Sequence, residues 1–206
     1  MEHGLAGQSW QILVSVWPSM LSGGGLAALG VVAGLGIAGY ERLLFVRAVE
    51  GWIDLVVLPL IRARSWWCRV TVIFLNNTSI LAVLVALGGW STGAASMGAA
   101  GMGLSLGAAL RVLARKTSTS WPVARHSDRA KETTVRVGVV LNLLEPPAII
   151  VAIGLAIGGA HVASTTSGEI WAAFGIWVAV PLLIAACGEA LWLGIYVPRQ
   201  PSCEPP

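Results

Sequence analysis

The hydrophobic residues of this chain occur in long runs that are separated by shorter polar connections. A helix needs about 20 apolar residues to cross the hydrocarbon core of a bilayer. Five runs reach that length, and they predict transmembrane helices over residues 12–40, 70–90, 93–113, 135–160 and 170–197. The pattern therefore predicts an all-α fold, a polytopic membrane helix bundle that forms a single integral membrane domain over residues 1–206.

Glycine and proline modify several of these runs. Pro18 and the glycines at positions 23–25 predict that the first span is kinked or starts properly only near Leu26. Pro146-Pro147 predicts a break in the fourth span, because two consecutive prolines remove two backbone donors. The second and third spans should form a tight hairpin with a turn at residues 88–93.

The connection between the first two spans contains a shorter apolar run at residues 52–61. Ten helical residues cover about 15 Å, which is half of the hydrocarbon core. We therefore expect an interfacial or re-entrant helix over residues 48–64 instead of a sixth span. The connection at residues 114–134 is polar and is predicted to be a loop.

Charged residues predict the orientation of the chain. All thirteen Lys and Arg residues lie in or beside the first and third connections or in the C-terminal tail, while the other connections and the N-terminus hold none. Basic residues favour the cytoplasmic side, so we expect the N-terminus outside and the C-terminus inside. Tryptophans at both predicted interfaces agree with this arrangement: Trp10, Trp17, Trp90 and Trp171 outside, and Trp52, Trp66, Trp67 and Trp121 inside.

Composition narrows the class of function. Only 11% of the residues are charged, against about a quarter in soluble domains, so the chain lacks a water-compatible surface. The basic residues flank spans and form no nucleic-acid-binding stripe. Cys68, Cys187 and Cys203 show no metal-ligand spacing, and the sequence contains no hydrolase or nucleotide-binding motif. We expect no catalytic, cofactor or metal site, and a protein that is not an enzyme.

Polar residues inside the spans are the candidate functional positions. Measured from the inner basic anchors, Asn76, Glu145 and Glu189 lie about 10, 14 and 15 Å deep. The candidate polar cluster consists of Asn76, Asn77, Asn142, Glu145 and Glu189. It either fixes helix packing through hydrogen bonds or binds a proton, a cation or a polar group of a partner.

Three pairs of glycines stand four residues apart within the spans: Gly30 and Gly34, Gly103 and Gly107, and Gly154 and Gly158. Small residues at this spacing allow helix backbones to approach closely in lipid. We expect them to serve packing within the chain, with a homo-oligomer interface as the alternative.

Several of these features together resemble the stage II sporulation protein M family. Phe74-Leu75-Asn76-Asn77 opens one span, a Gly-rich span follows, and Leu144-Glu145-Pro146-Pro147-Ala148 leads into an apolar helix with repeated glycines. The resemblance covers residues 70–160. It places the family's Glu, Pro and Ala on Glu145, Pro147 and Ala148, and its Asn on Asn76 or Asn77. Leu141-Asn142 stands where the family has His-Gly.

The resemblance implies a function in the cell membrane. The founding member is similar to a scaffold that joins a membrane complex with cell-wall-degrading partners. It implies that this chain is a scaffold or anchor that contacts the lipid bilayer and other membrane or envelope proteins. The alternative is a small transporter or channel-like protein for a proton, cation or small solute that uses Glu145 and Glu189.

Overall fold

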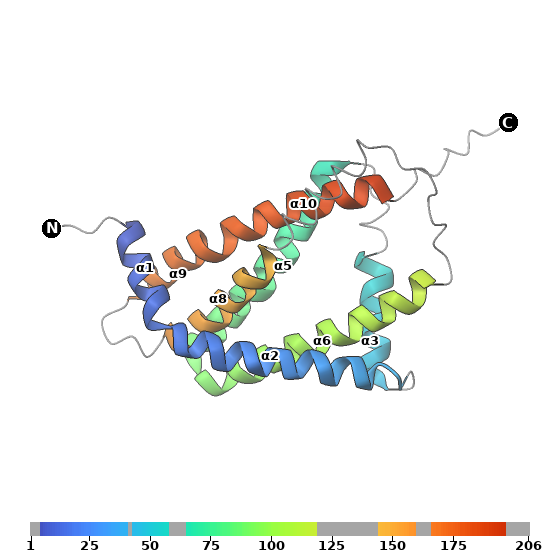
Figure 1. Ribbon diagram of the computed structural model, residues 1–206, viewed down its shortest axis with the longest axis horizontal. Helices are drawn as coiled ribbons and strands as arrows, with labels where there is room; N and C mark the ends of the chain where they lie inside the picture. The colour runs from blue at the N-terminus through green and yellow to red at the C-terminus, as the bar shows by residue number, and fades with distance from the viewer. Residues whose placement is uncertain (1–4, 41–42, 58–64, 119–143, 160–165, 197–206) are drawn as a thin grey trace.

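The computed structural model describes residues 5–40, 43–57, 65–118, 144–159 and 166–196. Every regular element in these ranges is helical, so the all-α prediction is confirmed. Figure 1 shows the helices along the chain. Their bounds are α1 (Leu5–Ser15), α2 (Trp17–Ile37), α3 (Leu44–Trp52), α5 (Trp66–Trp90), α6 (Thr92–Ser118), α8 (Glu145–Gly158), α9 (Ser167–Phe174) and α10 (Val180–Tyr196), with π-helical segments at Ile53–Val57 and Gly175–Ala179.

Four helices are long and apolar enough to cross a membrane, and they support the membrane location. They cover Trp17–Ile37, Trp66–Trp90, Thr92–Val112 and Ser167–Leu191, which match four of the five predicted spans. The predicted span 135–160 is described only from residue 144 to residue 159. There α8 has 14 residues, or about 21 Å of helix, which is less than the hydrocarbon core needs. The five-span count therefore stays a prediction.

The first predicted span is divided at a different place from the one we expected. Helix α2 continues without interruption through the glycines at 23–25, so the expectation of a kink near Leu26 is wrong. The break lies at Val16, immediately before Trp17 and Pro18 in the first turn of α2. Proline is preferred in a first turn, where its missing N–H leaves no bond unmade. Consequently α1 turns away from the axis of α2 (Figure 1).

Other boundaries shift by a few residues. Helix α6 extends to Ser118, so residues 114–118 of the predicted polar loop are helical. Helix α3 begins at Leu44, four residues before the predicted interfacial helix, and the described part of that segment ends at residue 57. In Figure 1, α3 lies across the long axis of the bundle at one end, as α1 does at the other. This orientation agrees with an interfacial helix.

The predicted hairpin has a very short turn. Ser91 alone separates α5 from α6, and it has an extended backbone with φ −158° and ψ 127°. From this apex the two helices diverge, as Figure 1 shows. The expected tight hairpin is therefore a wedge.

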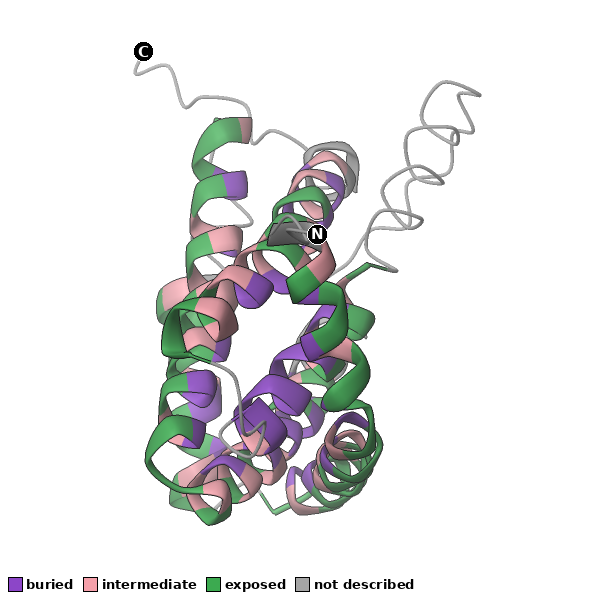
Figure 2. Ribbon diagram, turned by 90° about the vertical axis from the view of Figure 1, so that its left-hand side faces the viewer, coloured by how far each residue is buried: buried purple, intermediate pink, exposed green. Residues whose placement is uncertain are grey.

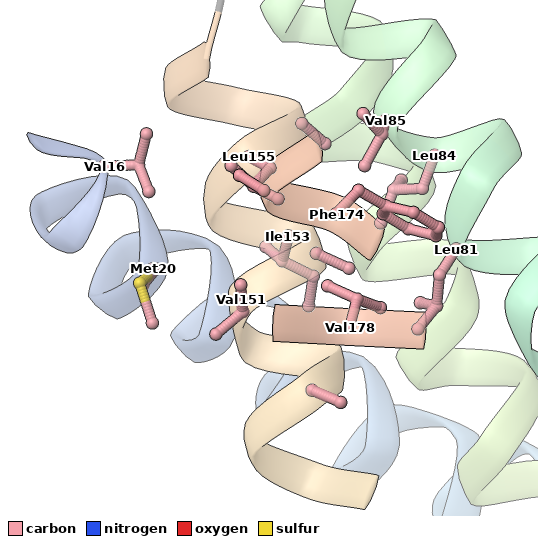
Figure 3. Close-up of a cluster of buried hydrophobic side chains, with 14 of the residues drawn as sticks. Val16, Met20, Leu81, Leu84, Val85, Val151, Ile153, Leu155, Phe174 and Val178 are labelled. Carbon is pink, nitrogen blue, oxygen red and sulfur yellow. The ribbon is translucent and has the colours of Figure 1, made fainter. Parts of the chain in front are cut away.

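The core of the bundle surrounds α8. Its residues 151–156 are buried without exception, and side chains from α1, α2, α5 and α9 pack around them. Figure 2 shows the buried positions on the inward sides of the helices. Figure 3 shows the aliphatic and aromatic side chains that fill this centre, among them Val16, Met20, Leu84, Ile153, Phe174 and Val178.

Helices α2 and α6 pack backbone to backbone through two glycine pairs. A Cβ atom placed on Gly30 or Gly34 would meet backbone atoms of residues 100–108, and one on Gly103 or Gly107 would meet backbone atoms of residues 27–35. Residue numbers rise together on both helices, so the pair is parallel. Arg111 of α6 adds a hydrogen bond of 3.1 Å from its Nη1 to the carbonyl of Leu35 near the end of α2. The glycine pairs therefore serve packing within this chain.

Basic residues lie toward one end of the bundle, and exposed tryptophans mark the other end. Arg47 in α3, Arg69 near the start of α5, and Arg111 and Arg115 near the end of α6 all lie on elements at the same end in Figure 1. Trp17 begins α2 and Trp90 ends α5 at the opposite end. Both tryptophans are more than half exposed, as expected for side chains at an interface.

Candidate functional site

A cleft of about 710 Å³ lies between the diverging helices α5 and α6. Its walls include residues 76–87 of α5 and residues 98–109 of α6, each range spanning about 16 Å of helix. Helices α2, α3 and α8 contribute further side chains. The lining is predominantly apolar, and its polar side chains are Asn76, Asn77, Ser105 and Glu145. An apolar cleft of this size with a few polar groups is typical of a binding site.

Three of the predicted polar residues form a chain of hydrogen bonds on the wall of this cleft. Asn77 donates from Nδ2 to Oε1 of Glu145 at 2.9 Å. Asn76 donates from Nδ2 to Oδ1 of Asn77 at 3.1 Å. The bond between Asn77 and Glu145 joins α5 to α8, as the structural alternative predicted. Because the three side chains are only partly buried, they are also accessible from the cleft.

Helices α5 and α8 run parallel, with a constant difference in residue number. Asn77 meets Glu145, and Gly88 meets the backbone of Ala156. Both differences are 68, since 145 − 77 and 156 − 88 are equal. The two contacts are eleven residues apart, or about three helical turns. A polar contact at one end and a close backbone approach at the other thus fix the position of the Glu145 carboxylate.

The double proline, which was predicted to break the fourth span, lies at the described start of α8. Within the described residues Pro146 and Pro147 occupy the first turn of α8, whose first intrahelical bond runs from the N–H of Ala148 to the carbonyl of Leu144 at 3.3 Å. A helix N-terminus leaves four N–H groups without intrahelical partners. Two prolines remove two of these donors, which favours a helix start inside the membrane. The part of the predicted fourth span before residue 144 lies outside the described residues.

The structure relates the two remaining candidates to the site in different ways. Asn142 lies outside the described residues. Glu189 is on α10 and lies close enough to Glu145 for their charges to repel each other. Glu189 does not line the cleft, however. The predicted common depth of the two carboxyl groups is consistent with their proximity, but depth alone did not reveal that only Glu145 lines the cleft.

Some lining residues were missed by sequence reasoning. Phe45 and Trp52 of α3 reach the cleft, although α3 was expected only to lie at the membrane surface. Ser105 also lines it and is exposed. The stripe of Gly98, Gly101 and Ser105 at spacings of three and four residues was the available signal for a small-residue wall on α6.

The chemistry of the described lining is acidic and amide-rich. It contains one carboxylate, two amides and one hydroxyl, and no basic side chain. Among the residues that the structure describes, no three His, Cys, Asp or Glu side chains are grouped to hold a metal ion. The arrangement can accept hydrogen bonds and attract a positive charge.

Comparisons with known proteins give no relative for this chain: no family model, no curated protein and no solved structure matches it. The resemblance to the stage II sporulation protein M family therefore stays a prediction.

Proposed function

We propose that this protein is a non-enzymatic membrane scaffold that binds a partner protein within the bilayer. The observation that carries the proposal is the cleft between α5 and α6, with the Asn76–Asn77–Glu145 chain on its wall. Ionisable residues at membrane depth usually serve function or pair with another polar group. The resemblance to a family whose founding member is a scaffold supports the same function.

Two surface variants of α6 form a matched test of this proposal. Ser105→Trp would fill the cleft, whereas Met97→Trp adds the same side chain at a position that is 78% exposed and outside the cleft. Each variant is expressed at native level, extracted in detergent and purified by affinity, and co-purifying proteins are quantified. We expect defined partners with the wild type and Met97→Trp, and their loss with Ser105→Trp. Repeated recovery of the wild type alone would refute the scaffold function.

The proposed orientation places the N-terminus outside and the C-terminus in the cytoplasm. It is supported by the basic residues of α3, α5 and α6, which lie toward one end of the bundle. Labelling with a membrane-impermeant thiol reagent in intact cells tests it. We expect a cysteine introduced at Gly168 to react from outside and Cys203 to be protected. Labelling of Cys203 from outside would reverse the assignment.

Transport of a proton or cation is the second candidate, because the carboxyl groups of Glu145 and Glu189 lie near each other on separate helices. Reconstituted vesicles test this function directly. A proton or monovalent cation flux that is lost in both Glu145→Gln and Glu189→Gln would favour transport. No flux above that of empty vesicles would leave the scaffold proposal as the stronger one.

The partner is expected to be a membrane or envelope protein, as the family resemblance implies. A second copy of the chain is a weaker candidate for the glycine faces. Gly30, Gly34, Gly103 and Gly107 already pack against each other's helices within one chain, so these positions are not available to a homo-oligomer.

A further inference from the structure

Glu145 brings an acidic group into a cleft whose described lining contains no basic side chain. In the described residues its Oε1 receives a hydrogen bond from Asn77, and Glu189 is a second acidic group nearby. A carboxylate at membrane depth is costly unless it pairs with another polar or charged group. An occupant with a positive charge would therefore complement the site.

The depth of the site limits where such a charge comes from. Asn77 is eight residues, or about 12 Å along α5, from Arg69 at the basic end of the bundle. Lipid head groups remain at the membrane surface, above this level. A bound metal ion usually needs several oxygen or nitrogen ligands, and the described residues contain no group of three acidic or metal-binding side chains. A basic side chain on a membrane-spanning segment reaches this depth and needs no set of metal ligands.

The walls of the cleft suit a helix. On α5 the lining positions Ile80, Val83 and Leu87 follow one another at spacings of three and four residues, and on α6 Gly98, Gly101 and Ser105 do the same. Each stripe extends along roughly 11 Å of its helix. Gly98 already packs against Leu84 and Leu87 of α5, whereas Gly101 has open space beside it and Ser105 is exposed. The small residues Gly101 and Ser105 therefore allow a neighbouring backbone to approach one wall, while the apolar residues on the other contact its side chains.

We propose that the cleft receives one transmembrane helix of a partner protein, and that this helix carries a Lys or Arg side chain that pairs with Glu145. The inference rests on the proposed scaffold function and specifies the chemistry of the partner. Asn77 holds the Glu145 carboxylate on the cleft wall, and Asn76 offers a further amide beside the incoming cation. The partner helix is otherwise apolar, in accordance with the rest of the lining.

A synthetic peptide serves as the probe. It is a 20-residue Leu/Ala helix with one lysine at its midpoint, about 15 Å from either end, so both insertion directions bring the charge near the level of Glu145. A dansyl group at one end accepts energy from the tryptophans of the full-length protein in lipid nanodiscs. The comparison peptide has leucine in place of the lysine.

We expect the lysine peptide to associate at least about tenfold more tightly than the leucine peptide. Glu145→Gln keeps an oxygen acceptor for Asn77 but removes the charge, and it should abolish the preference for lysine. Glu169→Gln is the matched control, because Glu169 lies in a capping box with Thr166 outside the cleft and glutamine retains such a box. Ser105→Trp should weaken both peptides, whereas Met97→Trp should weaken neither.

Equal affinity for the two peptides would overturn the inference, as would a lysine preference that survives Glu145→Gln in a protein with unchanged helical content. If Glu145→Gln does not fold, the Ser105→Trp and Met97→Trp pair decides, and equal binding by these two variants is a negative result. The scaffold function fails separately: it is lost when no native protein co-purifies with the wild type. Native partners that lack a basic residue in their spans would refute this inference alone.

Discussion

The glycine contact between α2 and α6 gives a prediction whose size follows from the structure. In Gly34→Ala the new Cβ would press against the backbone carbonyl of Leu104 and would lie 2.9 Å from the backbone nitrogen of Ala108. Both contacts are with backbone atoms, so relief requires the helices to separate. Gly25→Ala is the matched control, since it lies on the same helix and nothing stands within 4 Å of its added Cβ.

The free energy of unfolding separates the two variants. Replacing glycine by alanine within a helix favours folding by about 0.8–1.0 kcal/mol at either position, and this gain cancels in the comparison. Overpacking at Gly34 costs about 1–3 kcal/mol. Gly34→Ala should therefore be less stable than Gly25→Ala by about 1–3 kcal/mol, which lowers Tm by about 2–12 °C for a chain of this length.

Thermal or denaturant unfolding in bicelles, followed by tryptophan fluorescence and circular dichroism, measures this difference. A second comparison tests the contact itself: after Gly34→Ala has moved the helices apart, adding Gly107→Ala should cost less than it does in the wild type, because neighbouring substitutions couple. Equal stability of Gly34→Ala and Gly25→Ala would refute the backbone contact. Full additivity of Gly34→Ala and Gly107→Ala in the double variant would refute the idea that both glycines act through the same helix contact.

Three further substitutions test the polar contacts. Asn77→Leu removes the hydrogen bond between α5 and α8 and should lower the unfolding free energy by about 1–2 kcal/mol. Ser79→Leu, at an exposed position two residues later, should not lower it. Equal unfolding curves for the two variants would contradict the role of Asn77. Glu189→Gln relieves a repulsion with Glu145 and loses no hydrogen bond within the described residues, so its denaturation midpoint should equal or exceed that of the wild type, and a loss above about 0.5 kcal/mol would contradict this. Glu50→Gln removes the 3.2 Å ion pair with Arg115 between α3 and α6. Because both side chains are about one-third exposed, the unfolding free energy should change by less than about 1 kcal/mol in the same assay. A larger loss would mean that the pair anchors α3.

The sequence predicted the features that depend on single helices. Runs of apolar residues located the long helices within a few positions, and the spacing of Gly30 and Gly34 indicated a close helix contact. We predicted the break near Leu26 and not at Val16, because glycines weaken helices in water. In lipid the helix backbone keeps its internal hydrogen bonds, so the glycines did not interrupt α2. The better signal was Pro18 in a first turn.

Features that depend on the relation between helices were harder to predict. The depth of Glu145 and Glu189 follows from counting residues, but the direction of each side chain depends on the rotation of α8 and α10 about their axes. The cleft arises because α5 and α6 diverge from Ser91, and the contacts of α6 with α2 and of α5 with α8 maintain that divergence. Pairings between helices 68 or more residues apart leave no local pattern in the sequence.

The parallel arrangement of α5 and α8 has a consequence for biogenesis. Parallel neighbours cannot arise as a simple hairpin, so Asn77 enters the membrane long before Glu145 has been synthesised. At about 5–20 residues per second, the 68 residues between them require about 3–14 s of translation. During that interval Asn77 lacks the Glu145 carboxylate that later accepts its hydrogen bond, and Asn76 has only Asn77 as its described partner. A chaperone or the insertion machinery that shields this face of α5 would act in this window, and it would release the helix when α8 arrives.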